Sequence, residues 1–374
     1  MRILFVTANP YLPQLHGGMQ SSAHELCCAL KHQGHKVAVL SGFLSGAPLG
    51  WRCAMQQKLL KRTLMRDAAL GYPVWRSVSP WNDLEYVAKK ETPDLIVVMA
   101  VEPVRMALAA RRTQIPVLMQ LQDVEFHMLG GRFEDLGDDI PSVANSRFTA
   151  EKYRNAYGVD PTVIYPFISA DRYKTKTTTE NITFVNPKPI KGRDIALAVA
   201  RRCPDIPFTF VESWTLCQDE RQLLTETLPA LPNVTLLPPQ NDMRSVYAKC
   251  KILLAPSIWE EGYGRVVTEA QISGIPVVAS RRGGLPEAVG QGGILVDADG
   301  PIEDWVTVIR KLWLDDRCYA ELSAAALTHA GRPENSLSWK LGLWEQALLN
   351  ACGPSSIPSK VLNIDPITAE ARNA

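Results

Sequence analysis

The sequence predicts an α/β fold with doubly wound parallel sheets in two domains. The chain is 374 residues long, more than one domain usually holds, and 46% of its residues are hydrophobic, which is enough for two cores. Residues 1–40 read as an apolar strand, a loop with glycines, a helix and a second strand, which is how a doubly wound parallel sheet begins. A similar order of strand, glycine loop, helix and strand returns at residues 252–297.

Composition and charge exclude several classes of protein. The formal net charge is +1, which argues against a nucleic-acid binder held by bulk electrostatics. No apolar run reaches the about 18 residues that a membrane helix needs. The cysteines lack the CxxC spacing of a metal site, so we expect reduced thiols and a cytoplasmic protein. These cysteines are Cys27, Cys28, Cys53, Cys203, Cys217, Cys250, Cys318 and Cys352.

The N-terminal half has the pattern of one parallel sheet with its helices. Apolar runs predict strands at residues 1–8, 36–40, 94–100 and 116–121. Helical periodicity predicts helices at residues 21–33 and 104–112. The loop with Gly17 and Gly18 lacks the G-x-G-x-x-G spacing of a dinucleotide site. Ser146 is expected to cap the N-terminus of a further helix.

Residues 51–66 carry five basic residues and no acidic one, and apolar residues lie between them. The pattern predicts an amphipathic basic helix, which can lie on an anionic membrane surface. A solvated face on a packed helix has the same pattern. Weak peripheral association with the inner face of the membrane and an ordinary packed helix therefore both stay open.

The C-terminal half repeats the alternation of strands and helices. Strands are predicted at residues 182–185, 208–211, 233–237, 252–255, 275–280 and 293–297. Helices are predicted at residues 242–249, 265–273, 302–314, 316–330 and 338–349. Residues 174–180 have the composition of a linker, and residues 353–374 have little periodicity.

Residues 261–269 carry the chemistry of the predicted site. Gly262 and Gly264 form a loop ahead of a helix, where unpaired backbone N–H groups and the helix dipole favour an anion such as a diphosphate. Glu261 and Glu269 bracket this loop, and their carboxylates suit sugar hydroxyls better than phosphate. The arrangement predicts a nucleotide-sugar site. The alternative is a tight turn with two solvated glutamates.

This segment resembles the donor-site signature of the retaining glycosyltransferases of family 4, which have the GT-B fold. The matching residues are EGYG from Glu261, EA from Glu269, GIPVVA at 274–279, and Glu287. Lys191-Gly192 resembles the Lys-Gly of the same family. The resemblance implies two Rossmann-like domains that face each other across a deep cleft. The implied segments are an acceptor domain at 1–168, a donor domain at 169–335, a helix at 336–352 that crosses back, and a tail at 353–374.

The resemblance also assigns roles to residues. Glu261 is expected to hold the hydroxyls of the donor sugar, Glu269 those of the ribose, and Lys191 the diphosphate. Glu261, Lys191 and Gln122 are the expected catalytic residues. The expected donor-binding residues are Gly17, Gly18, Asn186, Lys191, Pro239, Glu261, Gly262, Tyr263, Gly264, Arg265, Val266 and Glu269.

Two positions depart from the family pattern. Gln122 stands where many relatives have a histidine, and it still donates and accepts hydrogen bonds. His127 is the alternative residue for that role. Asn186 stands where most relatives have an arginine, so either Lys188 supplies the missing charge or the site has one cation fewer.

The expected reaction is transfer of a hexosyl group from a nucleotide diphosphate sugar to a hydroxyl, with retention of configuration. UDP-glucose is the first choice of donor, and a saccharide or lipid-linked saccharide is the expected acceptor, in polysaccharide or glycoconjugate biosynthesis. No cofactor and no metal are expected, and Asp297-Ala298-Asp299 is interpreted as a structural turn. The alternatives are a nucleotide-sugar epimerase or sugar phosphorylase of the same fold, and a non-catalytic binder of nucleotide sugars.

Overall fold

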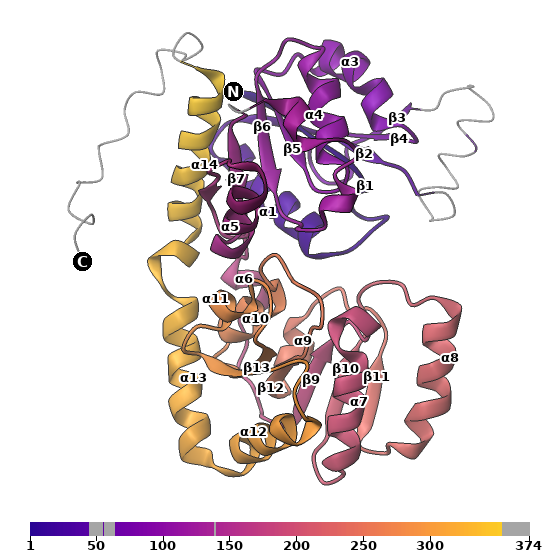
Figure 1. Ribbon diagram of the computed structural model, residues 1–374, viewed down its shortest axis with the longest axis vertical. Coiled ribbons are helices and arrows are strands. Elements are labelled where there is room, and N and C mark those ends of the chain that lie inside the picture. Colours follow the sequence, from indigo (N-terminus) through magenta and orange to yellow (C-terminus); the bar gives the residue numbers. More distant parts are fainter. Residues whose placement is uncertain (45–54, 56–63, 138–139, 354–374) are drawn as a thin grey trace.

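A computed structural model describes residues 1–44, 55, 64–137 and 140–353 of the chain. The described residues form two sheets, each flanked by helices, which lie one above the other in Figure 1. The first sheet has the strand order β3-β4-β2-β1-β5-β6-β7-β8, and only its edge strand β3 runs antiparallel to its neighbour. The strands are β1 (Arg2–Pro10), β2 (Lys36–Gly42), β3 (Leu64–Asp67), β4 (Val74–Ser77), β5 (Leu95–Met99), β6 (Val117–Leu121), β7 (Ser142–Ala144) and β8 (Thr162–Val163).

The second sheet is entirely parallel and has the order β11-β10-β9-β12-β13-β14. Its strands are β9 (Asn181–Val185), β10 (Phe208–Val211), β11 (Val234–Leu237), β12 (Cys250–Ala255), β13 (Val277–Ser280) and β14 (Gly293–Val296). The central strands of both sheets are mostly apolar because helices cover both of their faces. Every residue of β5 and of β13 is buried.

Helices pack on both faces of each sheet. In the first half, α1 and α14 share one hydrophobic core, and α3, α4 and α5 share the core on the other face. In the second half, α7 and α12 cover one face, and α10 and α11 cover the other. The helices are α1 (Gly18–His32), α3 (Pro80–Glu91), α4 (Pro103–Arg111), α5 (Arg147–Tyr157), α6 (Ala170–Tyr173), α7 (Arg193–Arg202), α8 (Gln218–Thr227), α9 (Arg244–Tyr247), α10 (Arg265–Gln271), α11 (Leu285–Val289), α12 (Ile302–Leu314), α13 (Asp316–Ala330) and α14 (Leu337–Cys352).

The last helix returns to the first half of the molecule. In Figure 1, α13 runs beside the second sheet and α14 continues upward beside the first. Trp344 and Leu348 of α14 are buried in the same core as Leu26 and Leu30 of α1. The final helix therefore belongs to the core of the first domain.

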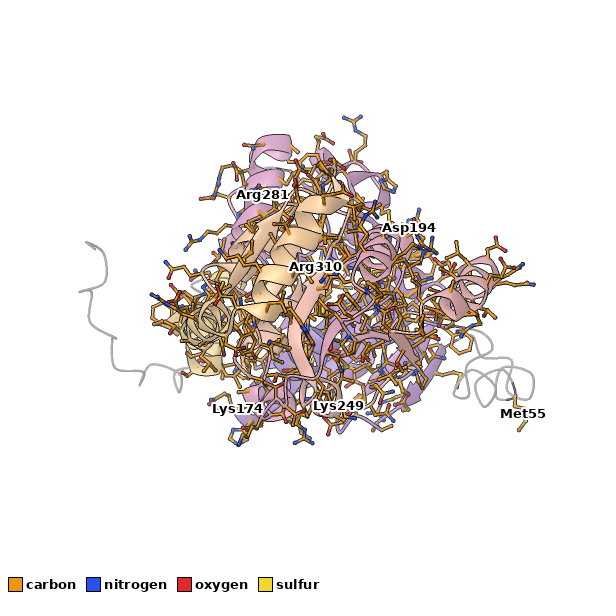
Figure 2. All side chains as sticks on the ribbon, turned by 90° about the horizontal axis from the view of Figure 1, so that it is seen from below. Met55, Lys174, Asp194, Lys249, Arg281 and Arg310 are labelled. Carbon is orange, nitrogen blue, oxygen red and sulfur yellow. The ribbon has the colours of Figure 1, made fainter. Side chains whose placement is uncertain are left out.

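Figure 2, seen from below, shows α12 with Arg310, which pairs with Asp205 at 2.9 Å beyond the end of α7.

The strands predicted from apolar runs are confirmed, with bounds shifted by a few residues. The predicted helix at 51–66 is wrong at its end, because Leu64–Asp67 form β3 and pair antiparallel with Val74–Ser77. The rest of that segment, like residues 354–374, lies outside the described residues apart from Met55. The chain leaves the first sheet at Val163 and enters the second at Asn181. Within the described residues, no helix is both long and apolar enough to cross a membrane.

Candidate functional site

A cavity of about 610 Å³ lies between the two halves of the molecule. Its lining comes from the carboxyl ends of parallel strands in both sheets, which is where such sheets bind ligands. The volume is in the range of small-molecule sites. The residues that follow or end these strands and line the cavity are Asn9, Ala100, Gln122, Asn145, Asn186 and Ser257.

Most of the residues expected at the donor line this cavity. They are Gly17, Gly18, Gln122, Asn186, Lys191, Glu261, Gly262, Tyr263, Gly264, Arg265 and Val266. Pro239 and Glu269 are not among the lining residues. His127 is exposed and does not line the cavity either, so the structure gives no support to His127 as the substitute for Gln122.

The glycine loop packs tightly against the first domain. A methyl group added at Gly262 would lie 2.2 Å from the carbonyl oxygen of Gln122 and 2.9 Å from the side-chain nitrogen of Asn145. Gly264 has a φ of +91°, in the left-handed region that glycine tolerates, and directly precedes α10. The helix is shorter than predicted and ends at Gln271. Only glycine allows this close contact between the two halves.

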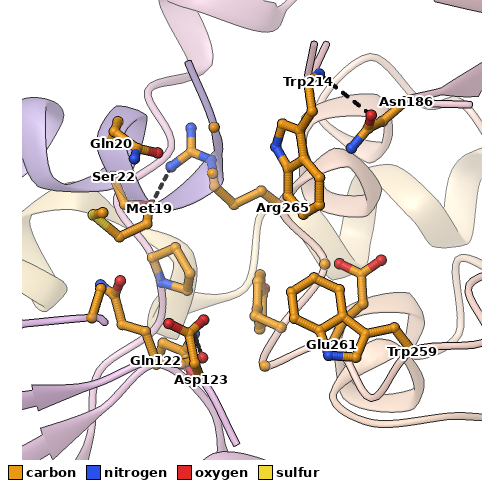
Figure 3. A pocket seen from close by; sticks show the side chains of 18 of the residues that line it. Met19, Gln20, Ser22, Gln122, Asp123, Asn186, Trp214, Trp259, Glu261 and Arg265 are labelled. Atoms are coloured by element: carbon orange, nitrogen blue, oxygen red, sulfur yellow. Dashed lines mark hydrogen bonds between the residues drawn. The ribbon is translucent and has the colours of Figure 1, made fainter. Parts of the chain in front are cut away.

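Lys191 and Glu261 meet at the second-domain wall of the cavity. The ammonium nitrogen of Lys191 lies 3.0 Å from a carboxylate oxygen of Glu261, and only 14% and 16% of the two side chains are exposed. The same ammonium group lies 4.8 Å from the ring centroid of Trp214 and 4.5 Å from that of Trp259. Both indole rings therefore stabilise this cation by cation–π interactions. Figure 3 shows Trp214, Trp259 and Glu261 on one side of the cavity, across from Gln122 and Asp123.

Sequence reasoning missed both tryptophans. Trp259 stands two residues before Glu261, and Trp214 follows β10, at the strand end that faces the cleft. The indole N–H of Trp259 donates a hydrogen bond to the Glu125 carboxylate of the first domain. Tryptophans placed just beyond strand ends in a doubly wound fold were the available signal, but their convergence on Lys191 depends on the tertiary structure.

The opposite wall of the cavity carries two carboxyl groups, those of Asp123 and Glu125. Burial, with the neighbouring Glu125 as a second cause, raises the pKa of Asp123 to about 6, against an opposing effect of Lys191. Burial also raises the pKa of Glu125. The hydroxyl of Tyr153 donates to the backbone carbonyl of Asp123 at 3.1 Å and fixes this turn.

The structure shows the surroundings of Asn186, one of the two departures from the family pattern. Asn186 adopts a φ of +68°, and its side-chain oxygen accepts a hydrogen bond from the backbone N–H of Trp214 at 3.3 Å. Lys188 pairs with Glu220 and does not line the cavity. Lys188 therefore does not replace the positive charge that an arginine at the position of Asn186 would supply.

Arg265 lines the cavity, but its guanidinium group is engaged in contacts that join the two halves. It lies 3.1 Å from the Glu25 carboxylate of α1 and 3.2 Å from the Glu269 carboxylate of α10. It also donates to the hydroxyls of Ser22 at 2.6 Å and Tyr173 at 3.0 Å. Arg265 therefore serves as a buried bridge between α1 and α10.

The carboxylate of Glu269 faces the guanidinium group of Arg265. Besides Arg265, its carboxylate accepts a hydrogen bond from the hydroxyl of Tyr247 at 3.0 Å. Burial raises the pKa of Glu269, and Arg265 and Tyr247 oppose that effect. The expected contact of Glu269 with a ribose stays a prediction that requires its side chain to exchange these partners.

Two further contacts fix the halves together. The Glu287 carboxylate accepts hydrogen bonds from the backbone N–H groups of Arg147 at 3.2 Å and Phe148 at 3.1 Å, in the first turn of α5. Lys152 of α5 pairs with Glu260 at 2.8 Å. A carboxylate at a helix N-terminus is electrostatically favourable, so Glu287 ties the second half of the molecule to α5.

The DxD sequence lies away from the cavity. Asp299 pairs with Arg282, and the Asp297 carboxylate accepts a hydrogen bond from the Asp299 backbone N–H at 3.0 Å. The residues that the structure describes contain no group of three or more His, Cys, Asp or Glu that could hold a metal ion.

Comparison with known proteins places this geometry in a family. Residues 16–172 match the family model described as Glycosyltransferase Family 4, and residues 196–315 match the one described as Glycosyl transferases group 1. A "D-inositol 3-phosphate glycosyltransferase" of Mycobacterium sp. (strain KMS) is 30% identical over 212 residues, which are 50% of this chain and 47% of that protein. The protein of that name from Corynebacterium kroppenstedtii is 44% identical over 96 residues, 25% of this chain and 21% of the relative.

Solved structures share the whole fold. Anabaena HepE, crystallised in complex with UDP-glucose, matches with a TM-score of 0.73 and 20% identity, over 92% of this chain and 99% of HepE. A glycosyltransferase from Rickettsia africae matches with a TM-score of 0.71 and 16% identity, over 94% of this chain and 99% of the other. The aligned part spans about half the length of the mycobacterial relative. The two family models and the shared architecture show that the chain belongs to the family 4 glycosyltransferases, with the GT-B fold.

Proposed function

We propose that the chain is a retaining, metal-independent glycosyltransferase. It transfers a hexosyl group from a nucleotide diphosphate sugar, with UDP-glucose favoured, to a hydroxyl of a saccharide or lipid-linked saccharide. The observation that carries the proposal is the pair of Lys191 and Glu261, 3.0 Å apart on one wall of the cavity between the halves. Lys191 is suited to bind the diphosphate and Glu261 to bind the sugar hydroxyls, and both line the cavity where donor and acceptor would have to come together. HepE, which was crystallised in complex with UDP-glucose, supports the choice of donor.

Donor binding requires an exchange of partners at this pair. The diphosphate replaces the Glu261 carboxylate as the counter-ion of Lys191, and Glu261 then accepts hydrogen bonds from the sugar hydroxyls. Trp214 and Trp259 hold the ammonium group in place during this exchange because their cation–π attraction remains when one anion replaces another. Lys191 is thus positioned before the donor arrives.

In the transfer step, the bond between the anomeric carbon and the diphosphate oxygen breaks, and the acceptor oxygen bonds to the same face of that carbon. The acceptor proton passes to the departing phosphate oxygen, so no side chain is needed as a base. Lys191 stabilises the negative charge that develops on the leaving diphosphate. The side chains of this chain act by orientation and electrostatics.

The first test is thermal-shift binding of UDP, GDP and ADP, each with and without EDTA. We expect UDP to stabilise the protein equally in both conditions. UDP release in the presence of UDP-glucose and an acceptor then separates a transferase from a binder, and NMR of the product gives the anomeric configuration. Loss of activity with EDTA that Mg²⁺ or Mn²⁺ restores would refute the metal-independent mechanism.

The second candidate is a non-catalytic binder of nucleotide sugars. Asn186 in place of a cation, with Lys188 neutralised by Glu220, is the observation that favours it. A binder would show the UDP-induced shift without steady UDP release. Membrane association through residues 51–66 is a separate proposal, and flotation with anionic liposomes at low salt tests it.

A further inference from the structure

The first-domain wall of the cavity differs from the donor wall in its charges. Within the described residues, this wall contributes no lysine or arginine, and His16 is its one residue that can carry a positive charge. It contributes two carboxyl groups, Asp123 and Glu125. The lysine and the arginine that line the cavity, Lys191 and Arg265, both come from the second domain and both already face carboxylates.

The same wall carries buried amide groups without complete hydrogen bonding. Gln120 and Gln122 lie on the same face at the end of β6, and their side chains are only 8% and 7% exposed. Asn145 follows the neighbouring strand β7, and its side-chain nitrogen donates to the backbone carbonyl of Gln122 at 3.1 Å. The side-chain oxygens of all three residues have no hydrogen-bond partner in the described part of the protein.

Buried polar atoms of this kind are unusual and costly unless a partner satisfies them. A sugar hydroxyl is a suitable partner for either end of a side-chain amide because it both donates and accepts. The Asp123 carboxyl group, which also has no hydrogen-bond partner among the described residues, adds a further acceptor. Gly262 abuts Gln122 and Asn145, so these groups lie next to the donor loop.

From this wall we propose that Gln120, Gln122, Asn145, Asp123 and Glu125 select an uncharged sugar as the acceptor and discriminate against a phosphorylated one. The proposal rests on the proposed function and defines the acceptor side of the same site. Among the described residues of this wall, an anionic acceptor group would meet two carboxyl groups and no lysine or arginine, and like charges in a partly buried site repel strongly. A neutral polyol would satisfy the amides.

The proposal separates this chain from the curated relatives, whose names specify inositol 3-phosphate. A phosphorylated acceptor needs a cationic partner on the acceptor side, and the described wall offers none of the lysines or arginines that usually bind phosphate. The acceptor is therefore expected to differ from the relatives' acceptor in charge.

The test measures sugar binding directly, with and without UDP, by saturation-transfer NMR on the full chain. The probes are matched pairs, methyl glucoside with glucose 6-phosphate and myo-inositol with myo-inositol 3-phosphate. We expect the neutral member of at least one pair to bind at least tenfold more tightly. Equal or tighter binding of the phosphorylated members, or no binding of any neutral member, would overturn the proposal.

Two variants assign the effect to the wall. The double variant Asp123→Asn/Glu125→Gln should reduce the discrimination at least fivefold, because it removes both negative charges. Gln120→Met should weaken binding of the neutral sugar at least fivefold, with a melting temperature that shows an intact fold. Glu151→Gln removes one charge from the exposed surface of α5, outside the cavity, and should change neither quantity. Unchanged discrimination in the double variant would contradict the proposal.

The UDP-induced thermal shift keeps the two hypotheses apart. If UDP stabilises the protein and phosphorylated sugars bind best, the acceptor proposal fails and the transferase proposal stands. If UDP has no effect but neutral sugars bind to the wall, the transferase proposal fails and the wall is still a neutral-sugar site.

Discussion

The ammonium group of Lys191 lies 3.0 Å from the Glu261 carboxylate and 4.8 Å and 4.5 Å from the ring centroids of Trp214 and Trp259, which contact each other edge to face. Two residues assigned to different parts of the donor are thus each other's partners in the free protein. Contact of either residue with the donor therefore competes with this ion pair. The site therefore has its charges balanced before the donor binds, which keeps a partly buried cation from remaining unpaired.

Glu261→Gln should have opposite effects on nucleotide binding and on turnover. Removal of the competing carboxylate frees Lys191, so UDP should bind more tightly. Loss of a charge-assisted hydrogen bond worth about 1.5–3 kcal/mol should slow turnover at least tenfold. UDP titration and UDP-release rates at saturating substrates measure the two effects. Glu260→Gln is the control because Glu260 pairs with Lys152 at the surface, and wild-type turnover in Glu261→Gln would contradict the assignment.

Lys191→Met should abolish the thermal shift that UDP induces, because the site loses the cation assigned to the diphosphate. Lys188→Met is the matched control, since Lys188 pairs with Glu220 outside the cavity. That variant should keep the UDP-induced shift even if its own melting temperature falls. An undiminished shift in Lys191→Met would place the diphosphate elsewhere.

Gly262→Ala should reduce activity at least tenfold and lower the melting temperature. The added methyl group would lie 2.2 Å from the carbonyl oxygen of Gln122 and would push the donor loop away from the first domain. Gly342→Ala, at an exposed position in α14 with open space around it, should instead stabilise the helix by about 0.5–1 kcal/mol. Full activity in Gly262→Ala would mean that the loop contact is dispensable.

Discrimination against anionic sugars should increase with pH through about 6, the pKa to which burial and Glu125 raise Asp123. Above that pH the carboxyl group of Asp123 is charged and, together with Glu125, repels an anionic sugar. Lys191 on the opposite wall attracts the same sugar. Glucose 6-sulfate is the probe because its charge is constant over pH 5–8. The ratio of its binding to that of methyl glucoside should fall as pH rises, and Asp123→Asn should show no such step. A step that persists in Asp123→Asn would identify another group.

Lys340 in α14 should make stability depend on pH. It is 1% exposed, donates to the Pro166 carbonyl at 2.8 Å, and burial, with Arg265 and Arg332 nearby, lowers its pKa from 10.5 to about 7. Between these pH values the unfolded chain binds the proton more tightly, so stability should rise as pH increases above about 7.

Melting temperatures of the wild type and of Lys340→Met from pH 7 to 9.5 measure this effect. The wild type should gain stability relative to Lys340→Met as pH rises. Lys311→Met, at an exposed position of α12, should track the wild type. Parallel curves for the wild type and Lys340→Met would show that the buried amine does not titrate in this range.

The regular part of the fold could be predicted from the sequence because its strands are buried on both faces. The run Leu95–Met99 is apolar throughout and therefore reads as a strand without tertiary information. The strand Leu64–Asp67 could not be found in this way, because it is a half-exposed edge strand that mixes apolar and charged residues. Short edge strands are defined by their neighbours and not by their own composition.

The same distinction applies to the site. The motif located Glu261 and Lys191 because their roles follow from loops next to strand ends. It did not show that Arg265 would pair with Glu25 as well as with Glu269, since Glu25 lies in α1, far along the chain from Arg265 and Glu269 in α10. It also did not identify Gln120 or Asn145. These two residues stand out only in the structure, where their buried side-chain oxygens have no hydrogen-bond partner among the described residues.

The position of α14 has a consequence for synthesis of the chain. Its buried residues Leu341, Trp344 and Leu348 complete the core beside α1, although they leave the ribosome after all the strands of the second sheet. Before they emerge, α1 has one apolar side without its partner, while the second sheet already has all its strands. The second half can therefore finish folding first, and the first half reaches its final state only after α14 has left the ribosome.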